Sequence, residues 1–273
     1  MSVNGRAKQI IAYFFLSVAV ISLYSISVFS QSVTPEGPDS INVTNSSRGS
    51  EGVGPVTIQA EAGNVTGLKI YDQRLTEAWQ GYYGNITGAI TLQDGSSNIF
   101  YDWQIANPRG EIYASNSSTT VRWTSIYCLN VSQNEGASFN VTIPFVRPGG
   151  AVSDVNSSRI ELSYGINATD LDGLNETFFS EPYTGSFSVA GTTIDSTDGC
   201  SFASPYVSNL PSVGTWNELI LSDNQSIIFT AVIRENAADF RGQTSDFQML
   251  VLENGHTGLD TSTTPYYFYV ELS

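Results

Sequence analysis

The chain has 273 residues, of which 41% are hydrophobic and only 14% are charged, and its formal net charge is −15. All but two of the 11 Lys and Arg residues follow position 30, as do all 26 Asp and Glu residues, so the main part of the chain is strongly acidic. Such a surface repels nucleic acid and anionic membranes, and we expect no nucleic-acid partner.

An uncharged apolar segment follows the first eight residues. Arg6 and Lys8 precede it, and it runs over residues 9–35. That length suits a membrane-spanning helix better than the shorter apolar core of a cleaved signal peptide. Its serines, however, dilute the apolar run, and Val28-Phe29-Ser30 before Gln31 suits a signal-peptidase cut. Residues 1–30 are therefore predicted to be either a signal peptide or an N-terminal membrane anchor. Both alternatives export the rest of the chain to the cell surface or beyond, because the positive residues come first.

Sequons for N-glycosylation are unusually frequent after this segment. The sequence has 19 asparagines, and chance would place about four of them in the N-x-[ST] pattern. The excess predicts a surface that carries N-linked glycans. The eleven sequon residues are Asn42, Asn45, Asn64, Asn85, Asn116, Asn130, Asn140, Asn156, Asn167, Asn175 and Asn224.

Residues 31–55 are rich in Pro, Gly, Ser and Thr and poor in large apolar side chains, which predicts a flexible glycosylated linker. A strand pattern begins at Val56, and residues 56–273 are predicted to form one extracellular domain. Within the linker, residues 40–44 have enough strand character to pair with the edge of a neighbouring subunit, although a disordered linker is the preferred interpretation.

The clearest predicted strand is 98–106, where Tyr101 and Trp103 fall on one face and Asp102 and Gln104 on the other, as in a half-buried strand. Similar patterns predict a hairpin of 216–221 with 227–234, and short helices around 153–164 and 170–178. Further strands are predicted at 110–115, 120–129, 138–145, 246–253 and 266–272. The chain is therefore expected to be all-β, an antiparallel β-sandwich with one or two short helices, preceded by an N-terminal hydrophobic helix.

Cys128 and Cys200 are the two cysteines of the chain. An even pair in an exported protein predicts one disulfide. The bridge would close a loop of about 70 residues and contribute roughly 4 kcal/mol on the chain-entropy model. It would also cross a possible domain boundary at Arg147 to Gly150, which favours a single domain.

The candidate ligand sites are weak. An acidic turn could offer oxygen atoms to Ca²⁺, although helix capping explains the same residues and no metal is expected; it contains Asp170, Asp172, Asn175 and Glu176. An aromatic group could form a platform for sugar rings, with core packing as the preferred interpretation; it consists of Trp79, Tyr82 and Tyr83.

Catalytic motifs are lacking in the sequence. His256 is the only histidine, and it follows Asn254-Gly255, a pair that predicts a turn. The sequence contains no nucleophile elbow, phosphate loop or dinucleotide fingerprint. A pair of catalytic carboxylates stays open, because sequence does not show the distance between them. We expect no enzymatic activity and no cofactor.

Several phrases of the sequence resemble a family of uncharacterised archaeal exported proteins. They are AGNVT from Ala62, WQGYYGN from Trp79, YDW from Tyr101, GEIYAS from Gly110, DFQMLV from Asp246 and YYFYVEL from Tyr266. The resemblance implies an archaeal origin and a single exported domain, and it implies no activity.

These observations together predict a heavily N-glycosylated archaeal cell-surface or secreted protein with a structural or adhesive role. Its expected partners are its glycans, other copies of itself or other cell-envelope proteins, and the membrane if the N-terminal segment is retained. The alternatives are a subunit of an extracellular, pilus-like filament and a carbohydrate-binding module.

Overall fold

The computed structural model describes nine stretches of the chain, residues 34–50, 54–117, 121–129, 157–167, 169–178, 181–212, 217–223, 226–253 and 263–272 among its 273 residues. The chain divides into two units, 1–32 and 33–273, and every described residue belongs to the second. The N-terminal hydrophobic helix, the strand at 138–145 and His256 fall outside the described residues. Among the described helices, none is long and apolar enough to cross a membrane.

A five-stranded antiparallel sheet forms the centre of this second unit, with the strand order β15-β4-β11-β10-β5. β10 and β11 form the predicted hairpin, in which Ser222 pairs with Ile227. β15 lies at one edge and pairs with β4 over its whole length. The strands are β4 (Gly110–Ser115), β5 (Tyr127–Cys128), β10 (Glu218–Ser222), β11 (Ile227–Val232) and β15 (Tyr267–Leu272).

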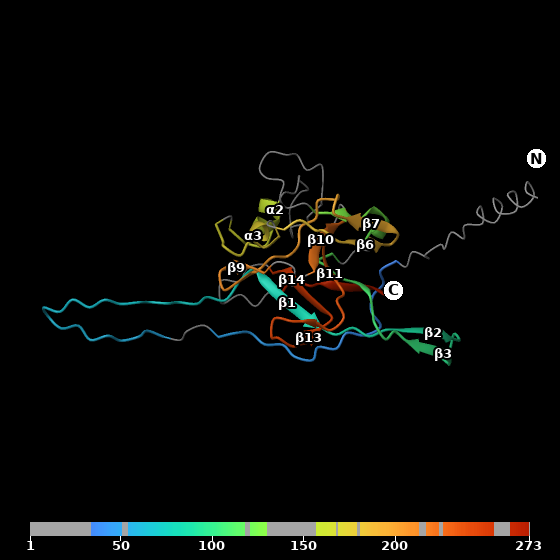
Figure 1. Ribbon diagram of the computed structural model, residues 1–273, viewed down its shortest axis with the longest axis horizontal. Helices are drawn as coiled ribbons and strands as arrows, with labels where there is room; N and C mark the ends of the chain where they lie inside the picture. Colours follow the sequence, from blue (N-terminus) through green and yellow to red (C-terminus); the bar gives the residue numbers. More distant parts are fainter. Residues whose placement is uncertain are drawn as a thin grey trace, which may run out of the picture. The chain divides into compact units, whose positions relative to one another are not determined.

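One face of this sheet is covered by a second antiparallel pair and by two short helices (Figure 1). The pair consists of β1 (Trp79–Gly84) and β14 (Phe247–Leu252). The helices are α2 (Ser157–Ser163) and α3 (Leu174–Phe178), both within ranges predicted to be helical. Phe229 from the sheet, Met249 from β14 and Phe178 from α3 meet in this core because each strand directs alternate side chains to one face.

The opposite face carries a second core around the disulfide. Cys128 on β5 is bonded to Cys200, with Cα atoms 5.1 Å apart, which confirms the predicted bridge. Tyr113, Ile228 and Leu221 from the central sheet contribute to this core. It also contains η1 (Trp123–Ser125) and the hairpin of β6 (Ser186–Val189) and β7 (Thr192–Asp195).

The fold class is as predicted: an antiparallel all-β sandwich with two short helices in its described part. The single strand predicted at 120–129 is wrong. Only Tyr127 and Cys128 pair with the sheet there, and Trp123 lies in the η1 turn, where its ring fills the disulfide core. Two small hairpins lie outside the central sheet, namely β8 (Tyr206–Val207) with β9 (Leu210–Pro211) and β12 (Ala237–Ala238) with β13 (Thr244–Ser245).

The predicted strand at 98–106 pairs with only one neighbour. β3 (Ile99–Gln104) forms a two-stranded hairpin with β2 (Ala89–Gln93), and every residue of both strands is exposed. The expectation of a half-buried strand is therefore wrong for these residues within the described part of a single copy. The pattern marked an amphipathic strand correctly, but nothing described in the same chain covers its apolar face.

Part of the predicted linker contacts the domain. Glu36 forms an isolated bridge to Val270 of β15, with hydrogen bonds in both directions of 3.1 and 2.8 Å between main-chain N and O atoms. Residues 39–50 and 54–74, by contrast, run through exposed positions before β1 begins. The packed part of the domain thus begins near Ala78, later than the strand pattern at Val56 indicated.

Candidate functional site

Two glutamates lie side by side at the edge of the central sheet. Glu111 on β4 and Glu271 on β15 are directly opposite in the strand register, so their side chains share one face. The Tyr113 hydroxyl donates a hydrogen bond to Glu271 Oε2 at 3.4 Å, and the Ala190 N–H donates to the same atom at 3.4 Å. Glu111 itself is buried. The pair is thus the clearest concentration of ionisable groups in this core.

The main-chain geometry beside the pair requires a glycine. Gly110 has φ of +121°, and an added Cβ atom there would lie 1.9 Å from the main-chain oxygen of Glu271. Only a residue without a side chain allows β15 to approach β4 so closely at this point. Gly110 therefore fixes how the two carboxyl groups face one another.

Burial sets the charge of this pair. Burial, and after it the negative charge of Glu271, raises the pKa of Glu111 to about 8, while the hydrogen bond with Tyr113 acts in the opposite direction. The pKa of Glu271 is also raised, mainly by burial. Glu111 is consequently protonated at neutral pH, which removes most of the repulsion between the two groups.

A protonated and an ionised carboxyl group can serve as acid and base in glycoside hydrolysis. Such chemistry also needs a substrate position between the two groups. Here Glu111 is buried beneath Tyr113 and near Tyr183, whose pKa is raised to about 12 by burial and then by the charge of Glu111. We therefore interpret the pair as a structural element of the sheet edge.

The three aromatic residues of the predicted sugar platform have different surroundings. Trp79 packs against Phe178 and Phe229, with ring centroids 5.9 and 6.5 Å apart. Tyr82 packs edge-on against Phe268 at 5.3 Å. Both rings lie partly buried against the larger core, which supports the core interpretation for these two.

Tyr83 instead belongs to a surface cluster with Arg241. The guanidinium carbon lies 4.1 Å from the Tyr83 ring centroid, and Arg241 Nη1 donates a hydrogen bond to the Tyr83 hydroxyl at 3.1 Å. Arg241 also forms an ion pair with Asp239 at 2.5 Å, and its hydrogen bonds lower the pKa of Asp239 to about 2. The cation thus contacts the Tyr83 ring and donates its N–H groups to Asp239, both from its own chain.

The acidic turn does not assemble a cation site. Among the described residues, no three acidic, histidine or cysteine side chains are close enough to hold a metal ion. Asp170 Oδ2 accepts the Asn167 N–H at 2.8 Å, and Asp172 Oδ2 accepts the Thr76 hydroxyl.

The start of α3 is stabilised by a residue that the sequence did not single out. Glu161 on α2 is buried, and its Oε1 atom accepts the Asn175 N–H at 3.2 Å. A carboxylate at that position satisfies an N–H group that has no partner inside the helix. Burial raises the pKa of Glu161, so this contact stabilises the helix pair at some electrostatic cost.

The sequon asparagines that the structure describes fall into two groups. Two of them are partly buried: Asn116 donates from Nδ2 to the Tyr164 hydroxyl at 3.0 Å, and the Oδ1 atom of Asn175 is buried. The Nδ2 atom is also the attachment point of an N-glycan, so a glycan on Asn116 would compete with this contact. The exposed group comprises Asn42, Asn45, Asn64, Asn85 and Asn167. The remaining sequons, Asn130, Asn140, Asn156 and Asn224, lie in stretches without described structure.

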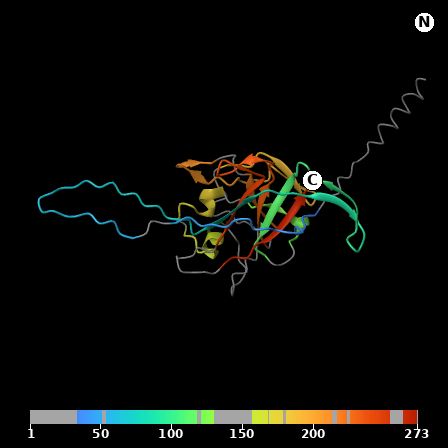
Figure 2. The ribbon, with the colours of Figure 1, turned by 90° about the horizontal axis from the view of Figure 1, so that it is seen from below.

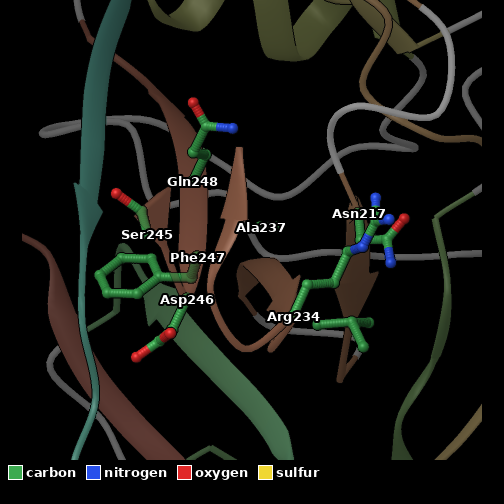
Figure 3. Close-up of a pocket in the computed structure, with 8 residues that line it drawn as sticks. Asn217, Arg234, Ala237, Ser245, Asp246, Phe247 and Gln248 are labelled. Atoms are coloured by element: carbon green, nitrogen blue, oxygen red, sulfur yellow. The ribbon is translucent and has the colours of Figure 1, made fainter. Parts of the chain in front are cut away.

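A small hollow lies where β14 meets the β12–β13 hairpin (Figure 3). Gln248 and Phe247 line one side, and Arg234 and Asn217 line the other. Its volume is about 20 Å³, which is enough for roughly one water molecule. It is too small for a sugar or any other organic ligand.

Comparison with protein-family models, with curated proteins and with solved structures gave no match to this chain. Its function must therefore be inferred from its own residues. The sequence reasoning missed the buried acids Glu111 and Glu161 and the partly buried Glu271. A glutamate inside an otherwise apolar strand, as in GEIYAS and YFYVEL, was the available signal, but the pairing of the two strands was needed to bring Glu111 and Glu271 together.

Proposed function

We propose that this protein is an exported structural or adhesive component of the archaeal cell surface that carries N-linked glycans. The observation that carries the proposal is the exposure of five sequon asparagines on a β-sandwich that is closed by a disulfide. A disulfide is stable in an oxidising compartment. The archaeal origin follows from the sequence resemblance, and the apolar N-terminal segment provides the export signal.

The proposal is tested on protein isolated from its native host. Its intact mass should exceed the polypeptide mass by several glycans, and replacing Asn42 or Asn64 by Gln should each remove one glycan mass. Asn98, which is exposed but lies outside any sequon, provides the matched control, because Asn98→Gln should leave the glycan mass unchanged. A bare polypeptide mass, or a protein that external protease cannot reach on intact cells, would contradict the proposal.

A filament subunit is a second candidate, favoured by the edge of the central sheet. On the outer side of β15, the one described pairing is the isolated bridge between Glu36 and Val270. Most of that edge therefore has no described strand beside it. Unpaired sheet edges accept strands from other chains. Electron microscopy of native surface material distinguishes the two candidates, because filaments and a dispersed surface protein differ in appearance.

The carbohydrate-binding alternative receives less support. Trp79 and Tyr82 pack into the core, and Arg241 covers Tyr83. These contacts leave no common aromatic surface on which the three rings could stack against a sugar.

A further inference from the structure

The β2–β3 hairpin has one apolar face that no described residue covers. Ile90 pairs with Trp103, and Leu92 pairs with Tyr101. Directly opposite residues of an antiparallel pair lie on the same face, and so do residues two positions apart, so these four side chains form one surface. They are 43–70% exposed. The opposite face is mostly polar, with Thr91 paired to Asp102 and Ala89 to Gln104, although it also carries the exposed Phe100.

This hairpin face is costly for an isolated copy. A two-stranded hairpin without a covering layer is marginally stable in water. A single Trp side chain can bury about 200 Å² when it is covered, and Trp103 is 70% exposed. An apolar surface bordered by polar residues marks an interaction site.

A second exposed apolar feature is an extended arm, defined here as residues 54–74. It runs out and back through a turn in which the Asn64 N–H donates to the Glu61 oxygen at 3.3 Å, with Gly63 at φ +88°. Apart from this bond, its described residues make no main-chain hydrogen bond to other described residues. Its exposed apolar side chains are Val56, Ile58, Val65, Leu68, Ile70 and Tyr71.

The sequence of the arm is that of a strand pair. Both of its limbs are rich in β-branched residues, and in each of them large apolar side chains alternate with polar ones, as in Val56-Thr57-Ile58-Gln59 and Leu68-Lys69-Ile70. A solvated loop needs neither feature. The arm therefore has the composition of a strand pair that is packed against another surface. Most of its main-chain N–H and C=O groups form no hydrogen bond with other described residues.

We propose that the arm of one copy binds the apolar face and the open edge of the β2–β3 hairpin of a second copy. The two limbs, residues 54–60 and 65–74, each span at least roughly 23 Å when extended, which is long enough to cover the hairpin strands of five and six residues. The arm and the hairpin are each close to the 20 or more residues that one side of a standard interface contains. The inference rests on the structural role proposed above and names the partner as another copy of the chain.

Charge supports a second copy as the partner. The chain as a whole is strongly acidic, with a formal charge of −15, so most contacts between copies are repulsive. The arm is an exception, because Lys69 and Arg74 balance Glu61 and Asp72. It can therefore approach a hairpin that carries Asp94 and Asp102 without a charge penalty.

The two surfaces differ, so their contact is head-to-tail. In both views the arm and the hairpin leave the central sheet in opposite directions (Figures 1 and 2). A copy that binds through its arm keeps its own hairpin open for the next copy. Such a contact builds rings or open chains, whereas a contact between identical surfaces would end at a dimer.

The test uses two variants of the full exported chain. In the first, a short Gly-Ser linker replaces residues 54–74. The chain segments that flank the arm approach one another, because a side chain at Gly49 would lie 3.1 Å from Leu75. In the second, Ile90→Thr and Trp103→Ser make the hairpin face polar. A matched control, Thr91→Ser with Gln104→Ser, changes the same two strands on the polar face.

Sedimentation of the natural chain at rising concentration should show species larger than a dimer, and each variant alone should associate at least tenfold more weakly. An equal mixture of the two variants should form dimers and stop there, because it contains one functional arm and one functional face per pair. The control pair should behave as the natural chain does.

A natural chain that stays monomeric up to millimolar concentration, variants that still polymerise, or a mixture that forms no dimers would overturn the inference. The melting temperature and the intact disulfide establish that each variant is folded. Export and the glycans on sequons outside the arm do not depend on the arm, which carries only the Asn64 sequon. A monomeric exported glycoprotein would therefore remove this inference and leave the structural role in place.

Discussion

β11 and β3 show how two strands with similar local sequences reach opposite environments. β11 reads IIFTAV, lies between β4 and β10, and is buried throughout except for its last residue. β3 reads IFYDWQ, has one neighbour, and is exposed throughout. Apolar side chains on both faces of β11 require cover on both sides, which only a central strand obtains. The alternating pattern of β3 indicates that one of its faces should be covered, but it does not show which residues cover that face.

The largest expected difference between β11 and β3 is the loss of stability when an aromatic side chain is replaced by Ala. Phe229→Ala on β11 should lower the free energy of unfolding by about 3–5 kcal/mol, because it leaves a cavity in the core. Trp103→Ala on β3 should change it by less than about 0.5 kcal/mol in a monomeric sample. Urea denaturation measures both. Equal losses would show that the hairpin is covered within a single copy.

The disulfide should stabilise the central region alone. Cys128→Ala with Cys200→Ala should cost about 4 kcal/mol, since the bridge closes a long loop; the two residues are 72 apart in sequence. Hydrogen exchange should accelerate in β10 and β11 and stay unchanged in β2 and β3. Faster exchange in the hairpin as well would mean that the two regions unfold together.

The buried pair at the sheet edge predicts a pH effect. The folded-state pKa of Glu111 is about 8, above its ordinary value of 4.5, so the unfolded chain releases this proton first and stability falls as pH rises through this window. Glu111→Gln should therefore be more stable than the natural chain by about 4 kcal/mol at pH 8 and about equally stable at pH 4.

Melting curves of Glu111→Gln and the natural chain over this pH range measure the difference. Glu77, which is exposed two residues before β1 begins, provides the matched Glu→Gln control. A constant difference at all pH values would rule out protonation of Glu111 as its cause.

A smaller loss of stability is expected at Trp79, an aromatic residue that is partly buried and partly exposed. Trp79 is half-buried and contacts the core on one side, so Trp79→Ala should cost about 2 kcal/mol, which is less than a fully buried ring costs. Binding to a glycan array should not change. A variant of full stability that loses glycan binding would restore the sugar-platform alternative.

Local patterns predicted much of the sandwich. The hairpin of β10 and β11, the strands β4, β14 and β15 and both short helices were recognisable because their side chains repeat with the period of their secondary structure. The segment from Thr120 to Leu129 was wrongly predicted to be a single strand for a related reason. Its Val121, Trp123 and Ile126 are apolar because they fill the disulfide core, and a turn can present them as well as a strand.

The sequence by itself determined the all-β class and the cysteine pairing, and it predicts an export signal and glycan positions, because each depends on a short motif, a local period or the number of residues of one type. The tertiary structure decided which acids are neutral and which apolar strands have partners. Glu111 and Glu271 are 160 positions apart, and only the pairing of β4 with β15 brings their charges together. Likewise, only the packed structure shows that the β2–β3 hairpin and the arm are uncovered, since burial depends on every other part of the chain.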